Sequence, residues 1–126
     1  MQKLLLAGLG GFIGSAARYS IGIALVRTSA ALTFPLATLL VNVLGSFLIG
    51  LLLALPMRMM LSDDARVFLV VGVLGGFTTF SSFSADTLQL WRDAGAARAG
   101  LNVLLNVAVC LLAVYAGDLL GRSLAR

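Results

Sequence analysis

Four long apolar stretches limit what this chain can fold into. They run from about Leu4 to Val26, Leu36 to Leu55, Val67 to Leu90 and Ala99 to Leu120. Each holds about 20 residues or more, which at about 1.5 Å per helical residue crosses a hydrocarbon core about 30 Å thick. No alternating strand pattern is present, which argues against a transmembrane barrel. The sequence therefore predicts an all-α membrane protein with four transmembrane helices.

Composition removes the main alternatives to this class. Apolar residues make up 60% of the 126 residues and charged residues only 11%, against about 25% charged residues in soluble domains. The connecting segments are expected at about Arg27–Pro35, Pro56–Arg66 and Trp91–Arg98, with Ser62 as the N-cap of the third helix. They are too short to fold alone, so residues 1–126 are expected to form a single transmembrane domain. Histidine is absent and Cys110 is the only cysteine, which excludes histidine-based catalysis and an intrachain disulfide. No nucleophile–base pair is visible, so we expect no enzyme.

Basic residues near the helix ends give little preference for one orientation in the membrane. The side that holds both termini and the second loop has five of them, Lys3, Arg58, Arg66, Arg122 and Arg126. The other side has three, Arg27, Arg92 and Arg98. This asymmetry is weak under the positive-inside rule, so we expect insertion both ways and an antiparallel, dual-topology homodimer. The net charge of +4 is expected to attract the lipid bilayer, and no nucleic acid partner is expected.

The third stretch contains a glycine and hydroxyl segment, Gly72-Val73-Leu74-Gly75-Gly76-Phe77-Thr78-Thr79-Phe80-Ser81-Ser82-Phe83-Ser84. Its paired glycines are poor helix formers, and the segment lies near the middle of the membrane. Unwound backbone at that depth is tolerated only where it is buried or lines a cavity. The segment therefore predicts a third helix broken at mid-membrane, whose freed carbonyls can hold a cation. A continuous helix, with hydroxyls bonded to its own carbonyls, is the alternative.

Two stripes of neutral polar residues follow the second and fourth stretches at helical spacing. The first is Thr38, Asn42 and Ser46, and the second is Asn102, Asn106 and Cys110. Residues four apart share one helix face, so the stripes suggest a polar path whose amides and hydroxyls donate to an anion. Hydrogen bonding between helices is the alternative role of such residues.

Aromatic and charged residues add further candidates. Phe80 and Phe83 are three residues apart, and their ring edges carry partial positive charge, although core packing explains the spacing equally well. Arg18 lies inside the first stretch, where a charge is either functional or extends toward the interface. Asp86 lies nearer a helix end and is a candidate partner for an arginine. The Gly10-x-x-x-Gly14 spacing lets helices approach closely.

Three motifs, in order along the chain, carry a family resemblance. They are Gly10-Gly11-x-x-Gly14-Ser15-x-x-Arg18-Tyr19, then Thr38-Leu39-x-Val41-Asn42-x-x-Gly45-x-Phe47-x-x-Gly50, then Gly72-x-x-Gly75-Gly76-Phe77-Thr78-Thr79-Phe80-Ser81-Ser82-Phe83-Ser84. Together with the length and four-helix layout, they resemble the CrcB/Fluc family of fluoride channels over the whole chain. The fourth helix matches mainly by position.

This resemblance implies a function and a set of site residues. It implies a multi-pass protein of the bacterial inner membrane, a dual-topology antiparallel homodimer with two narrow pores that exports fluoride passively and relieves its toxicity. It implies a central structural Na⁺, not transported, held by the backbone carbonyls of Gly75 and Thr78. The fluoride-contacting pair falls on Phe80 and Phe83. The remaining positions implied for the pore are Asn42, Asn106, Thr79, Ser82 and Thr38, with Arg18 in a vestibule.

Two positions depart from the family pattern. Ser82 stands where a Thr is usual, which keeps the hydroxyl, and Asp86 stands where a Glu is common, which shortens the reach of the carboxylate. Other classes of function stay open from the residues alone. A small dual-topology exporter of organic cations would use Asp86 to couple protons, and an assembly subunit would transport nothing.

Overall fold

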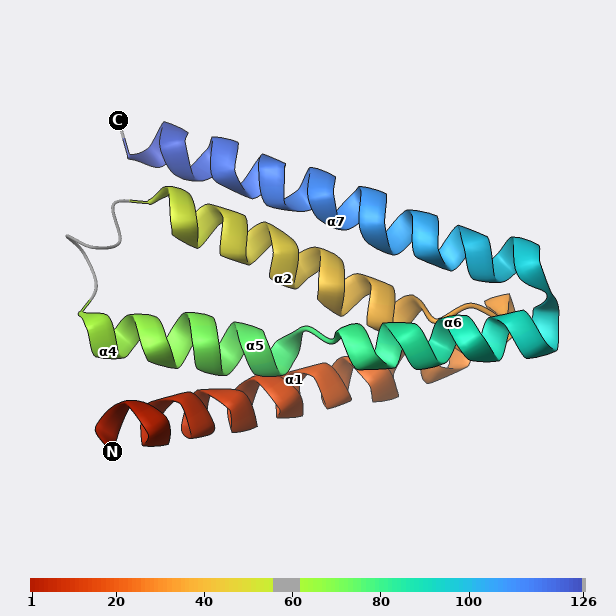
Figure 1. The fold of residues 1–126 in the computed structure, drawn as a ribbon, viewed down its shortest axis with the longest axis horizontal. Coiled ribbons are helices and arrows are strands. Elements are labelled where there is room, and N and C mark those ends of the chain that lie inside the picture. The colour runs from red at the N-terminus through yellow and green to blue at the C-terminus, as the bar shows by residue number, and fades with distance from the viewer. Residues whose placement is uncertain (56–61, 126) are drawn as a thin grey trace.

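Four helical segments run side by side along one long axis (Figure 1). The computed structural model describes residues 1–55 and 62–125. In this part of the chain, 4 segments are long and apolar enough to span a membrane: α1 (Gln2–Leu32), α2 (Leu36–Ala54), Asp63–Ala94 and α7 (Ala96–Leu124). The two chain termini lie at the same end of the bundle. The predicted all-helical membrane architecture is confirmed.

The third segment is divided into short helices. It consists of α4 (Asp63–Arg66), the π-helix η1 (Val67–Leu74), α5 (Gly75–Phe77) and α6 (Phe80–Ala94). The predicted break is seen in part, because α5 and α6 stay joined as one bent segment (Figure 1). π-Helices are rare and occur frequently at functional sites, and here η1 leads directly into the break.

The break lies inside the predicted glycine and hydroxyl segment, just after the glycine pair. Gly75 and Gly76 are helical, and only Thr78 (φ −79°, ψ 160°) and Thr79 (φ −155°, ψ 118°) have extended backbone. Gly76 serves close packing instead, since a Cβ added there would lie 2.5 Å from the backbone oxygen of Gly11, whereas one added at Gly75 would meet only the Val70 oxygen at 3.9 Å. Packing has therefore overridden the low helix propensity of glycine, which is only a weak preference.

Glycines bring the helices together in two pairs. α1 packs against η1 and α5, and α2 packs against α7. A Cβ added at Gly72 would lie 2.8 Å from the Cα of Gly10, and one added at Gly121 would lie 2.7 Å from the carbonyl oxygen of Leu51. The buried residues of α1 are Gly10 and Gly14, which confirms the predicted close approach at this spacing.

The connections are shorter than the sequence suggested. The expected loop at Arg27–Pro35 is helical as far as Leu32, and the expected loop at Trp91–Arg98 is reduced to Gly95 (φ 85°). The 31 residues of α1 span about 46 Å at the α-helical rise, which exceeds a hydrocarbon core of about 30 Å. Helix ends therefore continue into the interface, where polar residues are equally compatible with a helix. Residues 56–61, with Arg58, and residue 126 lie outside the described residues.

One arginine joins the two connections at the end of the bundle opposite the termini. α1 ends with Thr33 in the left-handed region (φ 48°). The guanidinium of Arg98 donates to the carbonyl oxygens of Leu32 (3.4 Å) and Thr33 (3.3 Å). A cation at a helix C-terminus is favourable because the last carbonyls carry partial negative charge.

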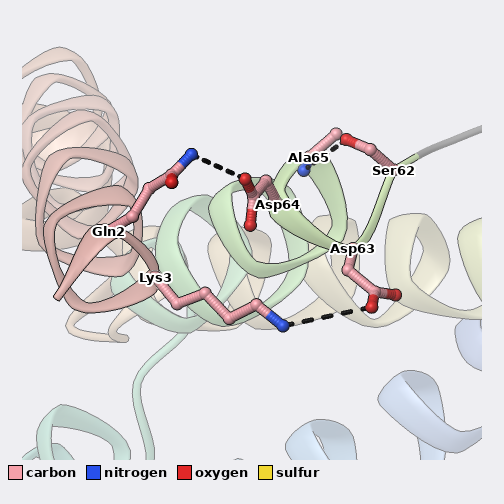
Figure 2. Close-up of polar contacts among 6 residues, drawn as sticks. All are labelled: Gln2, Lys3, Ser62, Asp63, Asp64 and Ala65. Atoms are coloured by element: carbon pink, nitrogen blue, oxygen red, sulfur yellow. Dashed lines mark hydrogen bonds and ion pairs between the residues drawn. The ribbon is translucent and has the colours of Figure 1, made fainter.

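At the other end, polar contacts join the start of α1 to the start of α4 (Figure 2). Ser62 caps α4, as predicted, by accepting a hydrogen bond from the amide of Ala65 (3.2 Å). Gln2 donates to the Asp64 carboxylate (2.7 Å), and the ammonium group of Lys3 lies 3.9 Å from the carboxylate of Asp63. The acidic pair also suits the positive end of the helix dipole.

Candidate functional site

Asn42 holds the break from the neighbouring helix α2. Its Oδ1 accepts a hydrogen bond from the Thr79 amide (2.9 Å), and its Nδ2 donates to the Thr79 carbonyl (3.1 Å). This double contact replaces the partners that a helix would give Thr79, which is only 8% exposed. Buried backbone groups need such partners, so Asn42 lowers the free-energy cost of the extended conformation inside a bilayer.

Two carbonyls at the break lose their usual helical donors. In a continuous helix, the carbonyl of Gly75 would accept from the amide of Thr79, and that of Thr78 from the amide of Ser82. The Thr79 amide instead donates to Asn42, and the Ser82 amide donates to the Thr79 hydroxyl at 3.1 Å. The hydroxyl thereby caps α6. The freed carbonyl oxygens are suitable ligands for a cation such as Na⁺.

The two polar stripes meet beside the break and form a chain of side-chain hydrogen bonds. Asn42 Nδ2 donates to Asn106 Oδ1 (3.1 Å), and Asn106 Nδ2 donates to Asn102 Oδ1 (3.0 Å). Asn102 Nδ2 donates to the hydroxyl of Thr87 (2.8 Å), which donates to the carbonyl of Phe83 (2.7 Å). Asn102 is 0% exposed and Asn106 6% exposed, so these amides are satisfied within the protein.

A neutral cavity of about 370 Å³ lies along one side of the break. Phe80 and Phe83 form part of its wall, with ring centroids 5.3 Å apart and planes tilted by 56°. Phe83 is 8% exposed, whereas Phe80 is 78% exposed, so the cavity opens toward the outside of the bundle. None of its lining residues is charged: Asn42, Gly45, Ser46, Ile49, Val70, Leu74, Gly75, Thr78, Thr79, Phe80, Phe83, Asn106, Val107 and Cys110.

A second cavity of about 290 Å³ lies on the other side of the break. It is lined by Ser15, Arg18, Tyr19, Gly22, Ala37, Thr38, Val41, Thr79 and Ser82. The half-buried Arg18 gives this cavity a positive charge. Thr79 is the one residue that lines both cavities, so the threonine at the break separates a cationic compartment from a neutral one.

The sequence-predicted residues divide between these compartments. Five candidate pore residues line the neutral cavity, namely Asn42, Thr79, Phe80, Phe83 and Asn106, as do Gly75 and Thr78. Arg18, Thr38 and Ser82 line the cationic cavity. Sequence reasoning missed Thr87, whose only signal is its place four residues after Phe83. It also left Asn102 as a stripe member without a role.

Asp86 has a hydroxyl partner in the structure. Thr38 donates to its Oδ2 at 2.6 Å. Asp86 also lines a third cavity, of about 610 Å³, at the end of the bundle that holds Arg98. The carboxylate therefore lies outside the neutral cavity.

The fold and site define a multi-pass membrane protein with neutral and cationic cavities on either side of a helix break. Comparison with known proteins gives the family, because residues 5–118 match the model described as CrcB-like protein, Camphor Resistance (CrcB). The chain belongs to this CrcB/Fluc family. It is 47% identical over 117 residues to the "Fluoride-specific ion channel FluC" of Elusimicrobium minutum, covering 93% of this chain and 91% of that protein.

Further relatives agree with this assignment. Proteins with the same name from Shewanella sp. (strain ANA-3) and Shewanella oneidensis are each 46% identical over 118 residues, covering 94% of both chains. The family resemblance predicted from the three motifs is confirmed. These relatives are named as ion channels, which confirms the prediction that the chain is not an enzyme.

Proposed function

We propose that this chain forms a fluoride-selective channel that lets fluoride leave the bacterial cytoplasm passively across the inner membrane and so relieves its toxicity. The names of relatives at 46% and 47% identity support fluoride as the ion. The observation that carries the proposal is the uncharged cavity beside the break, with its aromatic pair and its amides. An inside-negative potential drives an anion outward with about 2.3 kcal/mol per 100 mV, so no energy-coupling device is needed.

The two cavities suggest a route for the anion. Arg18 attracts the anion into the cationic cavity, and the Thr79 and Ser82 hydroxyls lie at the boundary to the neutral one. There, the ring edges of Phe80 and Phe83 replace part of the hydration shell. Fixed cations are absent from the lining residues of the neutral cavity, which keeps binding weak enough for the ion to leave.

A second copy in the opposite orientation completes the site. The exposed ring of Phe80 and the open side of the neutral cavity need another protein wall. An antiparallel partner brings a second break to the first, and the carbonyls of Gly75 and Thr78 from both copies then hold one structural Na⁺. The diversion of their helical donors to Asn42 and Thr79 supports this role. The bound ion would fix the breaks in place and would not be transported.

Reconstitution tests the conduction proposal directly. Purified protein in liposomes loaded with potassium fluoride, with sodium gluconate on both sides and an ionophore to carry potassium, should release fluoride to an ion-selective electrode. Matched liposomes loaded with potassium chloride should release chloride far more slowly. Release of chloride as fast as fluoride would reject selectivity. Proton-driven uptake of an organic cation that Asp86→Asn abolishes would favour the exporter instead.

The same liposomes test the sodium site. Fluoride efflux should persist when sodium is present on both sides and should fall when every sodium ion is replaced by N-methylglucamine. Potassium and lithium controls separate a specific site from ionic strength. Unchanged efflux after exhaustive sodium removal would contradict a structural Na⁺ at the carbonyls of Gly75 and Thr78.

A further inference from the structure

One chain of hydrogen bonds leads from the break through α2 and α7, with each group donating to the next. The Thr79 amide donates to Asn42, Asn42 to Asn106, Asn106 to Asn102 and Asn102 to Thr87. The Thr87 hydroxyl then donates to the carbonyl of Phe83. This series of hydrogen bonds therefore starts at the cap of α6, passes through α2 and α7, and returns to the first turn of α6.

The chemistry of Thr87 determines how the Asn102 amide is oriented. A hydroxyl has one hydrogen, and Thr87 uses it on the Phe83 carbonyl at 2.7 Å. Its oxygen can therefore only accept from Asn102, so the NH₂ group of Asn102 must face Thr87. The amide oxygen of Asn102 must then face Asn106. Because Asn102 is 0% exposed, water cannot substitute for any of these partners.

The orientation of the Asn102 amide fixes the orientation of the Asn106 amide, which lines the neutral cavity. Both hydrogens of Asn106 Nδ2 are occupied, by the carbonyl of Asn102 (3.1 Å) and by its Oδ1 (3.0 Å). Asn106 Oδ1 is consequently directed at Asn42 (3.1 Å) rather than turning freely toward the cavity. An anion in the cavity thus avoids the negative end of this amide dipole.

We propose that Asn102, anchored by Thr87, is a positioning residue that sets the amide polarity of the anion path without touching the ion. This inference rests on the proposed fluoride conduction. Loss of the anchor leaves the Asn106 amide held on this side only by the main-chain carbonyl of residue 102, so the amide oxygen can turn toward the cavity and repel fluoride, and the first turn of α6 loses a contact. Fluoride flux and the preference for fluoride over chloride then fall together.

Four variants test the inference in the liposome assay. Asn102→Leu removes the amide at similar volume, Thr87→Val removes the hydroxyl, and Thr87→Ser restores it. Ser84→Ala is the matched control, because Ser84 makes the same bond to a carbonyl four residues earlier on α6 (Phe80, 2.9 Å) but lies on an exposed face. Folding is checked by circular dichroism and by the size-exclusion profile in detergent.

We expect fluoride flux to fall in Asn102→Leu and Thr87→Val and to be restored in Thr87→Ser. Removing a partner of a buried hydrogen bond corresponds to roughly tenfold or more in an equilibrium, so fluoride efflux and the fluoride-to-chloride ratio should each fall about tenfold in Asn102→Leu and Thr87→Val. Thr87→Ser and Ser84→Ala should match the unaltered protein. If Asn102→Leu does not fold, the comparison of Thr87→Val with Thr87→Ser tests the inference.

A purely structural role has a different signature. Lower thermal stability and fewer active liposomes, with an unchanged fluoride-to-chloride ratio in Thr87→Val, would overturn the positioning role. Failure of the unaltered protein to conduct fluoride would instead reject the proposed function, so the two failures are distinguishable.

Discussion

At the scale of single residues, one side-chain amide provides hydrogen-bond partners for backbone groups at the helix break. Asn42 offers an acceptor and a donor at the spacing that the Thr79 backbone requires. Its two Nδ2 hydrogens are taken by Thr79 and Asn106, so Asn42 serves the proposed anion path by holding the break. The sequence predicted Asn42 as a pore residue but could not predict this clamp, because the clamp depends on the distance between α2 and the break.

Replacing this amide should therefore affect stability and flux together. Asn42→Leu leaves the amide and carbonyl of Thr79 without partners, which costs about 1–3 kcal/mol for each buried group. We expect a lower thermal unfolding midpoint and loss of fluoride efflux. Ser20→Ala, which removes a hydroxyl that bonds only within the exposed face of α1, should change neither. A stable Asn42→Leu protein would show that the break needs no clamp.

Phe80 allows function and stability to be separated. Its side chain is 78% exposed in the single chain, so Phe80→Ile leaves no cavity within the bundle. Fluoride efflux should fall at least tenfold through loss of the ring edge, while size-exclusion and circular dichroism profiles stay unchanged. Normal efflux in a well-folded Phe80→Ile protein would remove Phe80 from the anion path.

At the scale of elements, the helices are held by close contact between backbones rather than by apolar burial. Lipid is as apolar as leucine, so small residues that permit close approach drive association in a membrane. The sequence identified this spacing in α1 and predicted the four spans from apolar length alone. It predicted a break within the glycine and hydroxyl segment but not its position at Thr78 and Thr79, because Gly75 and Gly76 stay helical and Gly76 is needed for contact with Gly11.

Two glycine substitutions distinguish packing from propensity. Gly72→Ala places a methyl group 2.8 Å from the Cα of Gly10 and 2.9 Å from the carbonyl oxygen of Ala7, so we expect a destabilisation of about 1–3 kcal/mol by overpacking. Gly100→Ala meets nothing within 4 Å in the interior of α7, so we expect a gain of about 0.5–1 kcal/mol. Thermal unfolding in one detergent compares the two, and equal effects would contradict the packing role of Gly72.

At the scale of the whole molecule, charge near the helix ends governs how copies are oriented. Five basic residues against three leave the chain nearly balanced. Ser123→Lys together with Ala125→Lys adds two charges to the side that already has five, so insertion should become mostly one-way. Labelling of a terminal cysteine from each side of the membrane measures the orientation. Fluoride efflux should fall in parallel, because copies that all point the same way cannot form the proposed dimer. Full efflux from a one-way population would contradict the antiparallel arrangement.

Both ends of the polypeptide emerge at the same end of the bundle (Figure 1), and this has a consequence for gene fusion. If two inverted copies were encoded as one tandem protein, the last residue of the first repeat and the first residue of the second would lie on opposite faces of the bilayer. A hydrophilic tether cannot bridge them. Such a fusion would need one additional hydrophobic helix, or any odd number of them, between its halves.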